Sequence, residues 1–227
     1  MNRLAALFNN GSVTTFLQSS ESSYPVPTVE RTHKIDIEGD VERALHLYLV
    51  NPVNLIFEDY LRRPSVRPGQ SLTCKCQVTQ EKGMPWSRVD MLWYVANKVI
   101  LAMEVKRNDA IRPYEWNDAL PPNSAGLTLQ QQVQQLQQVV NLEKQQGDFV
   151  SLIFGKAEKI MRQVTKYFTA FKPPNILIFD WNNMILLDIK SAPSSGDFPH
   201  MSQTDGSGYW TFRRMLLAAL IDGLNRA

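Results

Sequence analysis

Short runs of apolar residues predict five β-strands. The first run alternates with polar residues, which is typical of a strand with one buried face, and its apolar positions are Leu72, Cys74, Cys76 and Val78. The later runs are more continuously apolar and predict buried strands. The strands are expected at 71–79, 88–95, 99–106, 175–180 and 184–189.

Apolar residues at helical spacing predict helices on both sides of these strands along the chain. Residues 38–63 are expected to form two helical pieces, because Gly39-Asp40 can start the first and Pro52 suits the first turn of the second. An amphipathic helix is predicted at 156–171 and a closing helix at 209–226. This order of elements indicates an α/β fold of the α+β kind, with helices flanking a mixed sheet.

Two segments carry few signals of a buried core. Residues 1–34 are rich in Ser, Thr and Pro, and we expect a flexible N-terminal arm. Residues 191–208 are rich in Ser, Gly and Pro, and we expect a flexible loop there. The remaining chain is predicted to be a single domain spanning 35–227.

A glutamine-rich stretch interrupts the chain between the third and fourth predicted strands, at 127–146. It holds seven glutamines between positions 130 and 138, with Leu129, Val133, Leu136 and Val140 at spacings typical of a helix. A coiled-coil pairing face is one interpretation. The pattern lasts less than two heptads, so an amphipathic helix that covers its own sheet, or a mobile insertion, is the favoured interpretation.

Composition is that of an ordinary globular protein. The 227 residues are 44% hydrophobic and 20% charged, which is enough for one sizeable core. A net charge of +2 gives no strong overall field toward nucleic acid, so binding of that kind would need a local basic groove. No run of about 18 apolar residues and no secretory leader are recognised, so we expect no membrane association.

The cysteines and histidines predict neither a disulfide nor a zinc site. Cys74 and Cys76 point to the same face of one predicted strand, where they are poorly placed to bridge. Reduced cysteines are consistent with an intracellular protein, whether nuclear or cytoplasmic. His33, His46 and His200 are scattered and form no zinc pattern.

Three charged residues interrupt the otherwise apolar hairpin predicted at 88–106. They are Asp90, Glu104 and Lys106. Burying an unpaired ion in a sheet core costs roughly several kcal/mol or more, so charged residues there need an explanation. Two carboxylates and a lysine that converge on one face predict a divalent-metal site for cutting phosphodiester bonds.

Whether these side chains meet depends on the turn between the two strands. A two-residue turn at Asn97-Lys98 would place Asp90 opposite Val105, on the wrong face of the sheet. A three-residue loop, 96–98, would place Asp90 opposite Glu104, and Asn97 tolerates the left-handed conformation that such a loop needs. The predicted site requires the longer loop.

The chemistry expected of this site is that of Mg²⁺ or Mn²⁺. These cations favour one or two carboxylates together with water and substrate phosphate as ligands. Asp90 and Glu104 are the predicted metal ligands, and the backbone carbonyl of Val105 could add another oxygen. Lys106 would orient the attacking water or stabilise charge on the phosphorus.

The pattern D-x13-E-x-K resembles the active site of the PD-(D/E)XK nuclease superfamily. Val89 stands where the motif that names the superfamily has proline. Downstream, Gln163 and Tyr167 lie on one face of the predicted helix at 156–171 and resemble the Q-x3-Y motif of the RecB-type branch. The helix and the two strands after it are also similar to nuclease-like domains of many fungal proteins.

The resemblance implies a restriction-endonuclease-like αβββαβ core and a metal-dependent deoxyribonuclease that uses a metal-activated water. It implies DNA as partner, with RNA left open, and DNA placement by Gln163 and Tyr167. Arg107, Arg112 and Lys166 are candidates for phosphate contacts. Some members of the superfamily use a carboxylate from an early helix, for which the sequence offers both Glu42 and Glu58. A catalytically inactive nuclease-like module that binds nucleic acid or protein is the alternative function.

Simpler structural roles are open for each of these residues. Asp90 could pair with Arg88 or Arg107 at a strand end. Glu104 and Lys106 could form an ion pair on an exposed strand face. Gln163 alone would suit a solvated helix face, and Tyr167 alone would suit the core. The superfamily interpretation rests on all five motif residues occurring in the expected order.

Overall fold

A single mixed sheet of six strands organises the computed structural model, which describes residues 37–79, 88–116, 153, 155–188, 200–204 and 211–227. The strands lie in the sheet in chain order, and all neighbours are antiparallel except β3 and β4, which are parallel. Their bounds are β1 Leu72–Thr79, β2 Arg88–Val95, β3 Lys98–Val105, β4 Asn175–Phe179, β5 Met184–Asp188 and β6 His200–Thr204. The first five strands match their predicted positions closely, and the hairpin predicted at 88–106 is confirmed.

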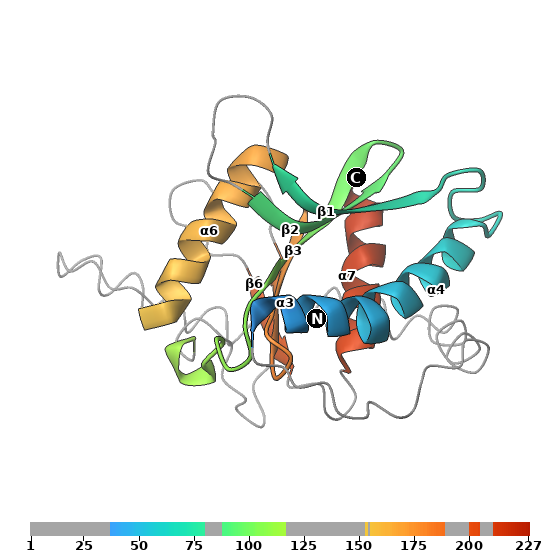
Figure 1. Ribbon diagram of the computed structural model, residues 1–227. Coiled ribbons are helices and arrows are strands. Elements are labelled where there is room, and N and C mark those ends of the chain that lie inside the picture. Colours follow the sequence, from blue (N-terminus) through green and yellow to red (C-terminus); the bar gives the residue numbers. More distant parts are fainter. Residues whose placement is uncertain (1–36, 80–87, 117–152, 154, 189–199, 205–210) are drawn as a thin grey trace, which may run out of the picture.

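Helices cover both faces of this sheet (Figure 1). One apolar core lies between the sheet and three helices, α3 (Glu38–Leu45), α4 (Asn51–Leu61) and α7 (Phe212–Arg226). A second core lies between the opposite face and α6 (Gly155–Phe171). Because parallel strands need a crossover connection, a long connection that contains α6 lies between β3 and β4. The mixed α/β fold with flanking helices is confirmed.

The two helical pieces predicted at 38–63 are present but continuous. Between α3 and α4 lies a π-helical turn, η1 (His46–Val50), and Pro52 occupies the first turn of α4. Proline cannot donate to the carbonyl four residues earlier, and a wider turn accommodates that missing hydrogen bond. The chain therefore keeps its helical direction through the proline.

The β2–β3 hairpin differs from the prediction in how its register arises. The turn has two residues, Ala96 and Asn97, both with positive φ, and not the predicted three-residue loop. A β-bulge then shifts the register between Trp93 and Tyr94 by one residue. Met91 therefore pairs with Met103, which aligns Asp90 with Glu104. The predicted alignment is confirmed, but the bulge produces it.

The bulge in β3 also explains a glycine in the closing helix α7. A Cβ atom at Gly223 would lie 2.0 Å from the carbonyl oxygen of Ile100, the residue that the bulge leaves unpaired. Only glycine permits α7 to lie this close to the strand. Thr211 begins α7 as its N-cap and accepts a hydrogen bond from the Arg214 backbone N–H.

The prediction of a flexible loop at 191–208 is wrong for its central part. Residues 200–204 form strand β6, which pairs with β5 from Asp188–His200 to Met184–Thr204. Ser, Gly and Pro residues surround this short edge strand in the sequence, so no strand pattern is recognised there. The N-terminal arm at 1–34 and the glutamine-rich stretch at 127–146 lie outside the described residues. Among the helices that are described, none is both long and apolar enough to span a membrane.

Candidate active site

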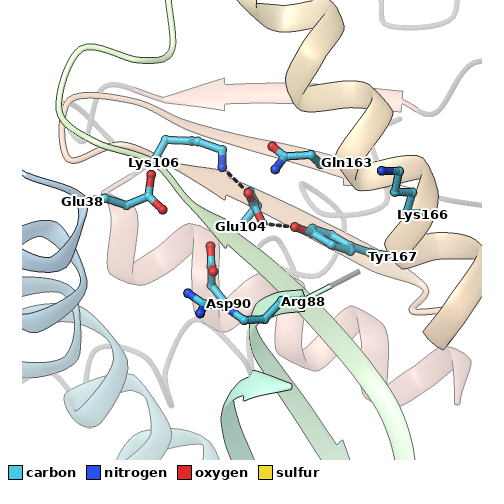
Figure 2. Close-up of a pocket in the computed structure, with 8 residues that line it drawn as sticks. All are labelled: Glu38, Arg88, Asp90, Glu104, Lys106, Gln163, Lys166 and Tyr167. Atoms are coloured by element: carbon cyan, nitrogen blue, oxygen red, sulfur yellow. Dashed lines mark hydrogen bonds and ion pairs between the residues drawn. The ribbon is translucent and has the colours of Figure 1, made fainter. Parts of the chain in front are cut away.

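A pocket of about 230 Å³ opens between the start of α3, the strands β2 and β3, and α6. Its lining is polar, and the side chains converge from these four elements (Figure 2). The lining residues are Glu38, Arg88, Asp90, Glu104, Lys106, Gln163, Lys166 and Tyr167. Asp90, Glu104, Lys106, Gln163 and Tyr167, all predicted from the sequence, therefore meet in one place.

The two central carboxylates are buried and have fixed partners. Asp90 is 7% exposed, and its Oδ2 accepts a hydrogen bond of 2.7 Å from the backbone N–H of Val105. Glu104 is 2% exposed; its Oε1 pairs with Lys106 Nζ, and its Oε2 accepts a hydrogen bond from the Tyr167 hydroxyl. These contacts hold both buried carboxylates in place at the floor of the pocket, and Figure 2 shows the two contacts of Glu104.

Burial and mutual repulsion work against two negative charges at this floor. The pKa of Asp90 is raised to about 7, first because the carboxyl is buried and second because Glu104 lies nearby. The Val105 N–H and the charge on Lys106 act in the opposite direction. A bound cation would relieve the same repulsion, so the electrostatics of the floor suit a cation site.

Tyr167 connects α6 to the carboxylates. Burial and the neighbouring Glu104 raise the pKa of its phenol, so the hydroxyl stays protonated and donates to Glu104. Gln163, one turn earlier on α6, is exposed and faces the pocket. The expectation that Tyr167 alone would be a core residue and Gln163 alone a solvated one describes their burial correctly.

The N-terminus of α6 is capped by Glu115, a residue far away in the sequence. The buried carboxylate of Glu115 accepts hydrogen bonds from the backbone N–H groups of Lys156 and Ala157, at 2.8 and 3.0 Å. A carboxylate at a helix N-terminus satisfies free N–H groups and favours the helix dipole. Glu115 thereby helps to position the helix that carries Gln163 and Tyr167.

The simpler roles considered for the charged residues are met only in part. Glu104 and Lys106 do form an ion pair, but their side chains are 3% and 15% exposed, so the pair is not on an exposed strand face. Among the described residues, Asp90 forms no ion pair with Arg88 or Arg107. Asp90 and Glu104 are thus buried next to each other, and no charged side chain in the described part of the chain forms an ion pair with Asp90.

The predicted early-helix carboxylates lie elsewhere. Glu58 on α4 pairs with Arg62, the residue that follows this helix, at 3.7 Å. Glu42 lies near Cys76, whose thiol pKa is raised first by burial and second by the charge on Glu42. Glu38, one turn before Glu42 on α3, lines the pocket in their place. The sequence signal was the helical spacing of four between Glu38 and Glu42, which places both on one face, but only packing shows which of them reaches the sheet.

The predicted phosphate contacts divide in the same way. Lys166 lines the pocket, whereas Arg107 is exposed and outside its lining, and Arg112 lies 3.6 Å from the carboxylate of Glu115. Arg88 lines the pocket and was not predicted as a contact. Its signal was its position two residues before Asp90, which places both side chains on one face of β2.

The donor chemistry of the pocket is of the type that a hard divalent cation accepts, with water needed for the remaining ligands. No group of three His, Cys, Asp or Glu side chains in the described part of the chain is arranged to hold a metal ion by itself. The oxygens of Asp90 and Glu104 are the donors that Mg²⁺ or Mn²⁺ prefers, and Mg²⁺ often uses only one or two protein carboxylates. The backbone N–H of Val105 is engaged by Asp90, and its carbonyl as a ligand stays a prediction.

Comparison of the chain with models of protein families, with curated proteins and with solved structures gives no match.

Proposed function

We propose that this protein is a metal-dependent nuclease that hydrolyses phosphodiester bonds in DNA. One observation carries the proposal: Asp90 and Glu104 from adjacent strands, and Lys106 two residues after Glu104, share one polar pocket. The sequence pattern and this geometry together support a site of the PD-(D/E)XK type in a restriction-endonuclease-like core. The succession of α3–α4, β1–β3, α6 and β4 is consistent with the αβββαβ order of such a core.

Each side chain of the site has a role in this proposal. Asp90 and Glu104 would hold Mg²⁺ or Mn²⁺, and Glu38 faces the same space. When bound, the cation supplies an acidified water as nucleophile and offsets charge on the phosphate. Lys106 places its ammonium at the carboxylate pair and stabilises negative charge that develops on the phosphate oxygens. Tyr167 fixes the orientation of Glu104 through its hydrogen bond.

A catalytically inactive binding module is the second candidate, and a specific observation favours it. Both oxygens of Glu104 and one oxygen of Asp90 already have hydrogen-bond partners within the chain. A protein that kept these contacts permanently could bind nucleic acid or a protein partner without cutting. The active form requires Lys106 to release Glu104, or to share it with the cation.

Cleavage of labelled single-stranded and duplex DNA distinguishes the two candidates. We expect the purified protein to cut DNA with Mg²⁺ or Mn²⁺ and to stop when EDTA is added. RNA of the same sequence, assayed in parallel, defines the substrate class. Tight binding of DNA without cleavage under any of these metals would favour the inactive module.

A further inference from the structure

Two cations of the pocket have no acidic partner in the described part of the chain. Lys106 is paired with Glu104, but Arg88 on β2 and Lys166 on α6 form no ion pair there. Both side chains are exposed. By contrast, Arg162, also exposed on α6, pairs with Glu158 at 2.6 Å. Arg88 and Lys166 are thus available to an external anion at the rim of the pocket.

The charges that line the pocket favour an anion once a metal is bound. Three carboxylates, Glu38, Asp90 and Glu104, face three cations, so the formal charges cancel. A divalent cation held by the carboxylates would add two positive charges, and Arg88 and Lys166 carry two of the positive charges outward. A nucleic-acid strand carries one negative charge per phosphate and matches this distribution.

The two cations stand on opposite sides of the carboxylate pair. Figure 2 shows Arg88 entering from β2 beside Asp90, while Lys166 enters from α6 beyond Gln163 and Tyr167. The buried Tyr167 donates a hydrogen bond to Glu104, and its neighbour on α6, Lys166, lines the same pocket. A strand whose phosphate reached the carboxylates would therefore pass one cation on each side.

We propose that Arg88 and Lys166 form a phosphate clamp, in which each binds a phosphate that flanks the one to be cut. The planar guanidinium of Arg88 can bind phosphate oxygens in pairs, and Lys166 acts as a point charge. The clamp rests on the proposed nuclease function and adds how the substrate strand is held. It binds the backbone alone, so it does not select sequence.

Salt-dependent DNA binding tests the clamp. A short fluorescein-labelled DNA, single-stranded in one series and duplex in another, is titrated with protein in Ca²⁺, which occupies oxygen-ligand sites. The variants are Arg88→Gln and Lys166→Gln, with Arg162→Gln as the matched control on α6. Circular dichroism and thermal melting confirm that each variant folds.

Each clamp variant should weaken binding equally for different DNA sequences. It should also lower the steepness of the slope of log affinity against log salt concentration, by about 0.7 for single strands or about 0.9 for duplex. Arg162→Gln should leave that dependence unchanged. If wild-type protein cuts DNA but either clamp variant keeps the wild-type dependence, or the control loses as much, the clamp is wrong and the nuclease function stands. If wild-type protein neither binds nor cuts DNA, both proposals fail.

Discussion

At the scale of one residue, the buried carboxyl of Asp90 lowers the stability of the folded protein. Its carboxyl is buried beside a second carboxylate, and its folded-state pKa rises from 3.8 to about 7. The structure retains this arrangement although a neutral residue would suit the position better. Buried carboxyls that repel a neighbouring carboxylate are frequent at functional sites, because a bound ligand relieves the repulsion.

The pH dependence of unfolding should reveal the raised pKa of Asp90. Between about pH 4 and pH 7 the folded chain holds a proton that the unfolded chain has lost, so the free energy of unfolding falls as pH rises through this window. The fall attributable to Asp90 is at most about 4 kcal/mol. Urea denaturation followed by circular dichroism measures it.

The variant Asp90→Asn should remove this fall and be more stable than wild type above about pH 7, because an amide oxygen can still accept from the Val105 N–H. Mg²⁺ should stabilise wild type at that pH and have little effect on Asp90→Asn, since a ligand that binds only the folded state stabilises it. Equal pH profiles for the two proteins would contradict the assignment of the shift to Asp90.

The β2–β3 hairpin and α7 together determine how Asp90 is aligned with Glu104. The tight turn at Ala96-Asn97 would place Asp90 and Glu104 on opposite faces if the strands were regular, and the bulge corrects this. The backbone of α7 contacts the bulge at Ile100 through Gly223. The geometry of the site therefore depends on a contact on the other side of the sheet.

Gly223→Ala should disrupt this contact. The new Cβ would lie 2.0 Å from the Ile100 carbonyl oxygen, so α7 or the bulge must move, and we expect a loss of at least about 2–3 kcal/mol in unfolding free energy. Gly39→Ala on α3 is the control, because its nearest neighbour is 3.9 Å away and alanine favours helices. Similar melting temperatures for both variants would show that α7 does not press on the bulge.

The N-terminus of α6 should depend on Glu115. Glu115→Ala removes the acceptor of two backbone N–H groups, and we expect a loss of about 1–2 kcal/mol. Hydrogen exchange should speed up in the first turn of α6, at Lys156 and Ala157, ahead of the sheet. Unchanged protection of these two amides would mean that the cap contributes little.

At the scale of the whole molecule, the pattern of apolar residues predicted most of the elements, because each of them buries apolar side chains on one or both faces. The strands at 88–95 and 175–179 follow the continuously apolar runs, and the helix at 155–171 follows the helical spacing, each to within about a residue or two. The sequence of the short edge strand β6 has no regular apolar pattern, and the backbone pairing with β5 defines this strand. Pairing of this kind leaves a weak pattern in the sequence.

The site was predictable as far as it depends on positions along one element. Asp90, Glu104 and Lys106 follow from strand alternation, and Gln163 and Tyr167 from helical spacing. Glu38 was missed because its presence in the pocket depends on how α3 packs against the sheet. Arg88 shares a face of β2 with Asp90, so alternation could have placed it in the pocket, but it was considered only as an ion-pair partner of Asp90. The bulge was missed because either turn length satisfied the apolar pattern.

The central claim is that Asp90, Glu104 and Lys106 form one metal-dependent site that cuts DNA, and the most direct test compares wild type with Lys106→Ala. Cleavage of labelled DNA in Mg²⁺ is measured for both, with Lys159→Ala, an exposed residue of α6 outside the pocket, as control. We expect Lys106→Ala to lose at least about 10²-fold in rate while it stays folded, because its charge stabilises the transition state. Lys159→Ala should cut like wild type. Equal rates for wild type and Lys106→Ala would contradict the claim and assign the cleavage to another site or another protein.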